Sequence, residues 1–143
     1  MYFDAASDYQ QFNKTIAYLV KKIREHCPDA EAVAARGTSG SLVLMSVASK
    51  LKIPAIFIRK TGEQAHTSQH SRTNLGRPKN FVIVDDFVSS GKTVDAIIKG
   101  LRECSTLTEA DCLAVFEYED KRNRAERKME TPEGFYIKIY ARR

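Results

Sequence analysis

One hydrophobic run in this 143-residue sequence ends abruptly in two acids. Residues 81–84 read Phe-Val-Ile-Val, and the adjacent carboxylates Asp85 and Asp86 follow directly. A buried strand tolerates two charges only where its end is exposed or paired, so the acidic pair marks the tip of a strand. The small polar residues 89–93 come next, and a helical apolar pattern follows them. This order predicts a strand, a ligand-binding loop at its carboxyl end and a helix.

The polar loop has the chemistry of a phosphate site. Its backbone amides and hydroxyls can surround a phosphate at the positive end of the next helix. A nucleotide-hydrolysing Walker A loop is excluded, because that motif needs a glycine five residues before Gly91, where Asp86 stands. The alternative is that Ser89 or Ser90 merely caps the helix and the two acids are solvated turn residues.

The remaining patterns alternate between strand and helix. Strands are predicted at 30–35, 54–58, 81–84, 112–118 and 135–140, and helices at 9–23 (ended by Pro28), 42–51 and 89–101. Such alternation predicts a single α/β domain, 1–143, with a mostly parallel twisted sheet and helices on both faces. The charged segment 119–134 separates the last two strands, and we interpret its first residues, 119–124, as a solvated face.

The excess positive charge lies in one stretch. The formal net charge is +5. Residues 59–79 hold five cations and a single acid, among many small polar residues. We interpret this stretch as a long loop that binds an anionic ligand, since structureless loops of ~20 residues are uncommon and usually functional. A nucleic-acid surface is the alternative, which the acids Asp85 and Asp86 disfavour.

Composition limits the class of protein. No apolar stretch approaches the ~18 residues that a membrane-spanning helix needs. The first ten residues contain neither a basic leader nor an apolar segment, so no secretory signal is expected. Three cysteines without a C-x-x-C pair are typical of free thiols in a reducing compartment. We therefore expect a cytoplasmic protein that does not associate with membranes.

The string VIVDDFVSSGKT, residues 82–93, resembles the 5-phosphoribosyl-1-pyrophosphate (PRPP) binding motif of type I phosphoribosyltransferases. Phe87 departs from this motif, because the family usually has a smaller aliphatic residue there. Residues 34–40 resemble the pyrophosphate loop of the family. Residues 56–62 resemble the strand and the Arg-Lys start of its flexible loop, particularly in adenine and xanthine enzymes. The resemblance therefore implies the type I phosphoribosyltransferase fold with a small hood.

The resemblance also implies a role for each motif. Asp85 and Asp86 would be the catalytic pair that holds the ribose hydroxyls. The 5-phosphate would be bound by Ser89, Ser90, Gly91, Lys92 and Thr93, and the pyrophosphate by Arg36, Gly37, Thr38, Ser39, Gly40, Arg59 and Lys60. The base would lie under a hood built from residues 1–25 and 119–134, with Tyr118 as its candidate contact. Mg²⁺ would bridge pyrophosphate and ribose oxygens, and no protein ligand of the metal is assigned.

The implied function is an Mg²⁺-dependent phosphoribosyltransferase of nucleotide salvage. It would transfer the 5-phosphoribosyl group of PRPP to a nitrogenous base, with a purine favoured, and release pyrophosphate. A homodimer is expected. The alternative is a regulator that binds PRPP or a nucleotide without turnover, with RNA as a partner that the basic isoelectric point of about 9.2 would suit.

Overall fold

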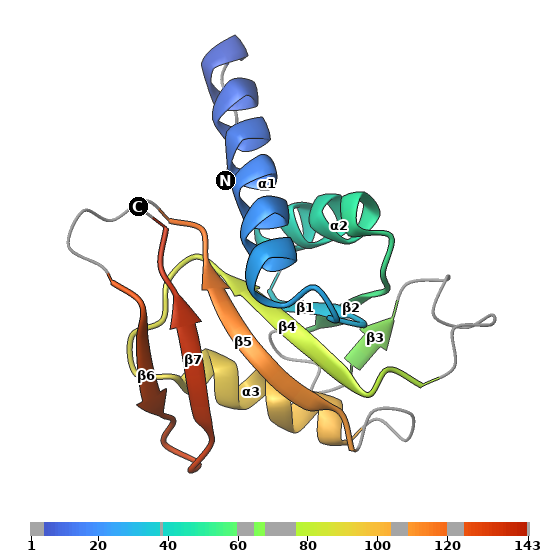
Figure 1. Ribbon diagram of the computed structural model, residues 1–143, viewed down its shortest axis with the longest axis vertical. Coiled ribbons are helices and arrows are strands. Elements are labelled where there is room, and N and C mark those ends of the chain that lie inside the picture. The colour runs from blue at the N-terminus through green and yellow to red at the C-terminus, as the bar shows by residue number, and fades with distance from the viewer. Residues whose placement is uncertain are drawn as a thin grey trace.

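The computed structural model describes residues 5–37, 39–59, 65–67, 77–103, 109–119 and 125–142. Its elements, in chain order, are α1 (Ala5–His26), β1 (Val33–Arg36), α2 (Ser39–Leu51), β2 (Ala55–Ile58), β3 (Ala65–Thr67), β4 (Asn80–Asp85), α3 (Lys92–Arg102), β5 (Asp111–Glu117), β6 (Arg127–Glu130) and β7 (Tyr136–Tyr140). All of these strands join one sheet (Figure 1).

The sheet is mostly parallel, as predicted. Its strand order is β3-β2-β1-β4-β5-β7-β6. The five strands from β2 to β7 in this order pair in parallel. The two edge strands, β3 and β6, pair antiparallel with their neighbours. The carboxyl ends of β1, β2, β4 and β5 therefore point to the same edge of the sheet, where ligands bind in folds of this kind.

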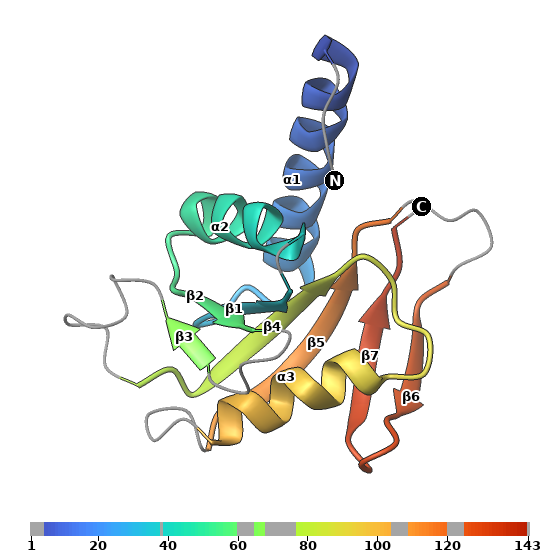
Figure 2. The same cartoon turned by 180° about the vertical axis from the view of Figure 1, so that it is seen from behind.

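Helices cover both faces of the sheet, which confirms the predicted architecture. Figures 1 and 2 show α1 and α2 on one face and α3 on the other. Alternate residues of each strand serve the two faces: Val82 and Val84 pack with α1 and α2, whereas Phe81 and Ile83 pack with α3. Because both faces are buried, the central strand β4 consists almost entirely of apolar residues.

The helix ends follow local sequence, but the starts differ from the prediction: α1 begins at Ala5 and not at Tyr9, and α2 begins at Ser39 and not at Leu42. Helix α1 ends at His26, two residues before Pro28, as predicted. Helix α3 begins at Lys92 and not at Ser89, because Gly91 has a left-handed φ of 91° and acts as its N-cap. The preceding serines consequently remain in the loop. Within the described part of the chain, no helix combines the length and apolar character required to cross a membrane.

Two strands were absent from the sequence prediction. Strand β3 lies inside the segment 59–79, which was predicted to be loop throughout, and pairs with β2. The rest of that segment up to residue 76, at 60–64 and 68–76, lies outside the described residues. Strand β6 lies inside the charged segment 119–134. Its sequence, Arg-Lys-Met-Glu, is polar because β6 is an edge strand with little burial, so no apolar alternation marks it.

The two segments predicted to form a hood both contribute to this main body. The second half of α1 buries Ile16, Leu19, Val20 and Ile23 against the sheet and α2. Figure 1 shows the first half of α1 extending beyond the sheet, where Tyr9 is 67% exposed. Residues 127–134 form β6 and the turn to β7. That these segments cover a bound base stays a prediction.

Candidate functional site

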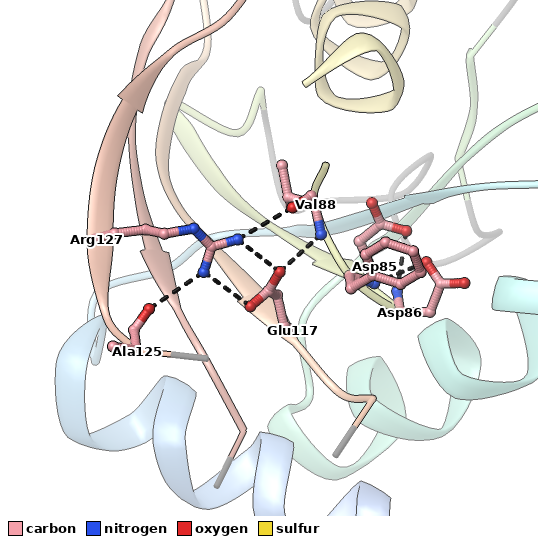
Figure 3. Close-up of polar contacts among 7 residues, drawn as sticks. Asp85, Asp86, Val88, Glu117, Ala125 and Arg127 are labelled. Atoms are coloured by element: carbon pink, nitrogen blue, oxygen red, sulfur yellow. Dashed lines mark hydrogen bonds and ion pairs between the residues drawn. The ribbon is translucent and has the colours of Figure 1, made fainter. Parts of the chain in front are cut away.

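The acidic pair lies at the tip of β4 (Figure 3). Asp85 is half-buried and Asp86 is exposed. The backbone N–H of Asp86 donates to Asp85 Oδ1 at 2.9 Å, and the N–H of Phe87 donates to Asp86 Oδ1 at 2.8 Å. These two bonds form the turn by which the chain leaves the sheet. They also fix both carboxylates at the mouth of the loop that follows.

The environment of the pair favours a positively charged ligand. Burial raises the pKa of Asp85 to about 7, and the hydrogen bond to the Asp86 side chain and the charge of Asp86 act in the same direction. Glu117, at the end of the neighbouring strand β5, adds a smaller effect of the same sign. A cationic centre brought to this tip would stabilise the ionised carboxylates, because opposite charges in a partly desolvated place attract strongly.

The polar loop after β4 forms a cradle that leads into α3. Residues 85–94 line a cavity of about 260 Å³. Ser89 and Ser90 are exposed, Gly91 is buried, and the N–H of Lys92 donates to Ser90 Oγ at 3.3 Å. The first N–H groups of α3 have no partners within the helix, so the loop lies at the positive end of the helix dipole. All five residues predicted to bind the 5-phosphate, Ser89, Ser90, Gly91, Lys92 and Thr93, therefore belong to one concave surface.

A second cavity brings residues of all three motifs together. It measures about 440 Å³ and lies where the ends of β1 and β2 approach α3. Arg36, Arg59 and Lys92 line it, one from each motif. Asp95, Lys99 and Glu133 line it as well. Asp95 is 5% exposed and accepts a hydrogen bond from the N–H of Glu133 at 3.0 Å. Sequence spacing alone did not indicate that Asp95 lines this cavity.

The other predicted pyrophosphate residues are described in part. Gly37 follows β1 with a left-handed φ of 82°, and its N–H donates to Ile58 O at 3.1 Å. Ser39 and Gly40 are the first residues of α2. Thr38 and Lys60 lie outside the described residues.

Tyr118, the predicted base contact, lies beside the acidic pair. It follows β5, and its N–H donates to Asp85 O at 3.0 Å. Its half-buried ring packs against the core on the α1 and α2 side of the sheet. Burial raises the pKa of its hydroxyl well above the ordinary range, with the charges of Asp86 and Asp85 adding to the effect. The hydroxyl therefore remains a neutral hydrogen-bonding group at physiological pH.

Two residues next to the site, Glu117 and Arg127, were not predicted from the sequence. Glu117 is the last residue of β5 and is 1% exposed, and Arg127 is the first residue of β6. Figure 3 shows the pair contacting Val88 in the polar loop. One signal could have identified Glu117, since it is an acid at the end of a hydrophobic run, just as Asp85 is.

A parallel α/β sheet with an acidic strand tip and a polar loop before a helix defines a class of phosphate-binding α/β proteins. Within that class, the family model described as a phosphoribosyl transferase domain matches residues 5–136. The chain therefore belongs to the phosphoribosyltransferase family.

Curated relatives include orotate phosphoribosyltransferases of streptococci. The protein of Streptococcus thermophilus is 29% identical over 101 residues, which cover 70% of this chain and 47% of the relative. The protein of Streptococcus gordonii is 30% identical over 101 residues, with the same two coverages of 70% and 47%. The chain thus spans about half the length of the curated relatives it matches.

Solved structures show the same fold at low identity. An adenine phosphoribosyltransferase aligns with a TM-score of 0.60 and 17% identity, covering 91% of this chain and 78% of the other. The orotate phosphoribosyltransferase of Francisella tularensis aligns with a TM-score of 0.61 and 13% identity, covering 96% and 67%. The type I phosphoribosyltransferase fold expected from the motifs is confirmed.

Proposed function

We propose that the chain binds PRPP at the tip of β4 and transfers its 5-phosphoribosyl group to a nitrogen of a base, releasing pyrophosphate. The observation that carries this proposal is the placement of Asp85 and Asp86 directly beside the concave loop at the start of α3. The two carboxylates suit the hydroxyls of a ribose ring, and the adjacent loop suits the phosphate on its 5-carbon. One site can therefore hold both parts.

The acidic pair suits the chemistry at the sugar. When a leaving group departs from an anomeric carbon, positive charge grows on the ring. The carboxylates of Asp85 and Asp86 would accept hydrogen bonds from the ribose hydroxyls and stabilise that charge. The raised pKa of Asp85 supports this role, because burial and the neighbouring Asp86 make its ionisation costly, and a cationic centre would offset that cost.

The cavity at the ends of β1 and β2 suits the leaving group. Pyrophosphate carries several negative charges, and this cavity is lined by the cations Arg36, Arg59, Lys92 and Lys99 against the acids Asp95, Glu103 and Glu133. Guanidinium groups bind phosphate oxygens with paired, charge-assisted hydrogen bonds. Lys92 borders both cavities, so the two phosphate-bearing ends of PRPP would lie on either side of it.

The residues present also fit Mg²⁺. Among the described residues, no group of three His, Cys, Asp or Glu side chains could hold a metal alone. Mg²⁺ binds hard oxygen donors and commonly takes most of them from substrate phosphates and water. The acidic pair offers such oxygens in the neighbouring cavity, which shares Lys92 with the pyrophosphate cavity, so we propose that Mg²⁺ enters with PRPP. The ion would neutralise the departing pyrophosphate.

The acceptor is proposed to be a purine. Residues 56–62 resemble adenine and xanthine enzymes, and adenine phosphoribosyltransferases are among the structures that share the fold. The matched curated relatives are named for orotate instead. The assay must therefore offer both kinds of base.

The test is pyrophosphate release from PRPP and Mg²⁺, with adenine, guanine, hypoxanthine, xanthine, uracil or orotate supplied singly. Release that depends on one purine supports the full proposal. Release with orotate or uracil alone supports the transfer reaction but shows that the acceptor is a pyrimidine and not a purine. PRPP binding measured by calorimetry, without release for any base, indicates the regulator. Absence of PRPP binding overturns the proposal.

The assembly and the compartment of the protein stay predictions. A homodimer is expected, and multi-angle light scattering of the full chain measures it directly. A monomer at all concentrations would contradict the expectation. Localisation of the tagged protein in its own cells would test the expected cytoplasmic location.

A further inference from the structure

Val88 is held at both of its backbone polar groups by one ion pair (Figure 3). Its N–H donates to Glu117 Oε2 at 2.7 Å. Its carbonyl accepts from Arg127 Nη2 at 3.1 Å. The guanidinium also donates to Glu117 through both terminal nitrogens, Nη1 to Oε1 at 3.1 Å and Nη2 to Oε2 at 2.9 Å, and to Ala125 O at 3.2 Å. Hydrogen bonds therefore join Glu117, Arg127 and Val88 in a ring.

Burying the charge of this ion pair costs desolvation free energy, and folding stability alone does not explain why it is charged. Glu117 is 1% exposed, so its carboxylate has lost nearly all contact with water. A buried ion pair can often be replaced by apolar residues with no loss of stability. Apolar side chains, however, cannot bond the N–H and carbonyl of Val88. What the pair supplies is a fixed backbone at that residue.

Val88 lies between the acidic pair and the residues predicted to bind the 5-phosphate. It follows the acidic pair by two residues and directly precedes Ser89, the first residue predicted to contact the 5-phosphate. Its own side chain is 3% exposed and packs in the core beneath α3. Ser89 and Ser90, by contrast, are exposed. A fixed residue thus lies immediately before the exposed ones.

The other end of the loop is held by the same part of the chain. A Cβ on Gly91 would lie 3.3 Å from Met129 Cε, 3.3 Å from Thr131 Cγ2 and 3.4 Å from Pro132 Cδ. These residues belong to β6 and to its turn toward β7. The strand that begins with Arg127 therefore packs against both ends of the exposed Ser89–Ser90 segment.

Arg127 also balances charge near the acidic pair. Asp85 and Glu117 are paired in register at the ends of β4 and β5. Without a counter-ion, a third carboxylate beside Asp85 and Asp86 would repel an incoming phosphate. The ion pair at 2.9 Å supplies that counter-ion.

We propose that Glu117 and Arg127 are positioning residues for PRPP, holding the loop after β4 in its phosphate-binding conformation through the backbone of Val88. The inference rests on the proposed function. A loop held in place before binding loses less freedom when the ligand arrives, which strengthens binding. A misplacement of about 1 Å in such a site can lower the reaction rate about a hundredfold.

The central variant is Arg127→Lys. Lysine keeps the positive charge opposite Glu117 but cannot bond both carboxylate oxygens and Val88 O in one plane. We expect the KM for PRPP to rise about tenfold with little change in kcat, because a loss of uniform binding acts on KM. The Val88 amide should exchange its hydrogen faster in the ligand-free protein. Arg102→Lys is the matched control, since Arg102 is exposed at the carboxyl end of α3, over the Phe135 ring and away from the loop, and should leave both readouts unchanged.

The double variant Glu117→Gln/Arg127→Gln separates positioning from stability. It removes both charges, so no unpaired charge remains buried and the melting temperature should stay closer to that of the wild type than in Arg127→Gln alone. The KM for PRPP should nevertheless stay high. A wild-type KM in this variant or in Arg127→Lys would overturn the positioning role, as would a fall in kcat at constant KM, which indicates a smaller folded fraction.

Failure of the proposed function gives a different result. If the wild type binds PRPP without turnover, the calorimetric Kd replaces KM in every comparison. If the wild type does not bind PRPP, the proposed function fails and the positioning of PRPP fails with it. Amide exchange at Val88 then still measures whether the ion pair holds the loop.

Discussion

The loops after β1 and β4 share a local conformation but are supported in different ways. Each contains a glycine with a left-handed backbone, Gly37 at φ 82° and Gly91 at φ 91°. A Cβ on Gly37 would meet nothing within 4 Å, whereas one on Gly91 would crowd Met129, Thr131 and Pro132. The loop after β4 therefore depends on long-range packing as well as on its own dihedral angles. At Gly37 no side chain crowds the backbone, and its N–H donates to Ile58 O at 3.1 Å.

This difference matches the two proposed tasks. A 5-phosphate is bound throughout the reaction, and a preformed loop is the better support for a group that does not move. Pyrophosphate departs, and the residues that face it come from separate elements, with Arg36 from β1 and Arg59 from the end of β2. Substitutions at the two loops should therefore have unequal effects.

The largest effect is expected from the double substitution Asp85→Asn and Asp86→Asn. Removing both charges beside the developing positive centre should lower turnover by about 10²–10³-fold, while the fold remains. Steady-state pyrophosphate release and circular dichroism measure the two properties. Asp111→Asn, an exposed change at the opposite end of β5, should leave turnover unchanged. A folded double variant with full activity would move the ribose away from the β4 tip.

The glycines give the direct comparison of the two loops. Gly91→Ala should lower the free energy of unfolding by about 2–4 kcal/mol, because the left-handed backbone costs about 1 kcal/mol or more and crowding adds roughly 1–3. Gly37→Ala should lose about 1 kcal/mol, since only the backbone cost applies. Urea denaturation measures both values. Equal losses would contradict the difference in support described above.

A smaller effect is expected from Asp85→Asn on thermal stability. The folded protein holds the Asp85 proton up to a pKa of about 7, against an ordinary value of 3.8, so ionisation costs stability as the pH rises between these values. The variant should therefore melt a few degrees higher than the wild type at pH 8, by a smaller margin at pH 5, and close to it near pH 3. Scanning calorimetry of the ligand-free proteins, with Asp111→Asn as baseline, makes the test. A higher melting temperature at pH 5 alone would reverse the sign and contradict the burial argument.

The central strands and the loop after β4 could be predicted because their causes are local. Buried parallel strands are apolar on both faces, so the apolar residues 81–84 predict β4, and the two acids that follow mark its end. Strand β6 could not be predicted, since an edge strand needs few apolar residues. The contacts of Glu117 with Val88 and Arg127 depend on three separate segments of the chain, and no spacing rule connects them.

The anchoring of Val88 also orders events during synthesis and folding. Its two partners follow it by 29 and 39 residues. A nascent chain that has emerged only as far as β5 contains the three motifs at 34–40, 56–62 and 82–93, yet it lacks Arg127. Long-range contacts form late because closing the intervening loop costs entropy. On the proposed positioning role, the PRPP site would form only after the edge strand has docked, and an unfinished chain should bind PRPP poorly.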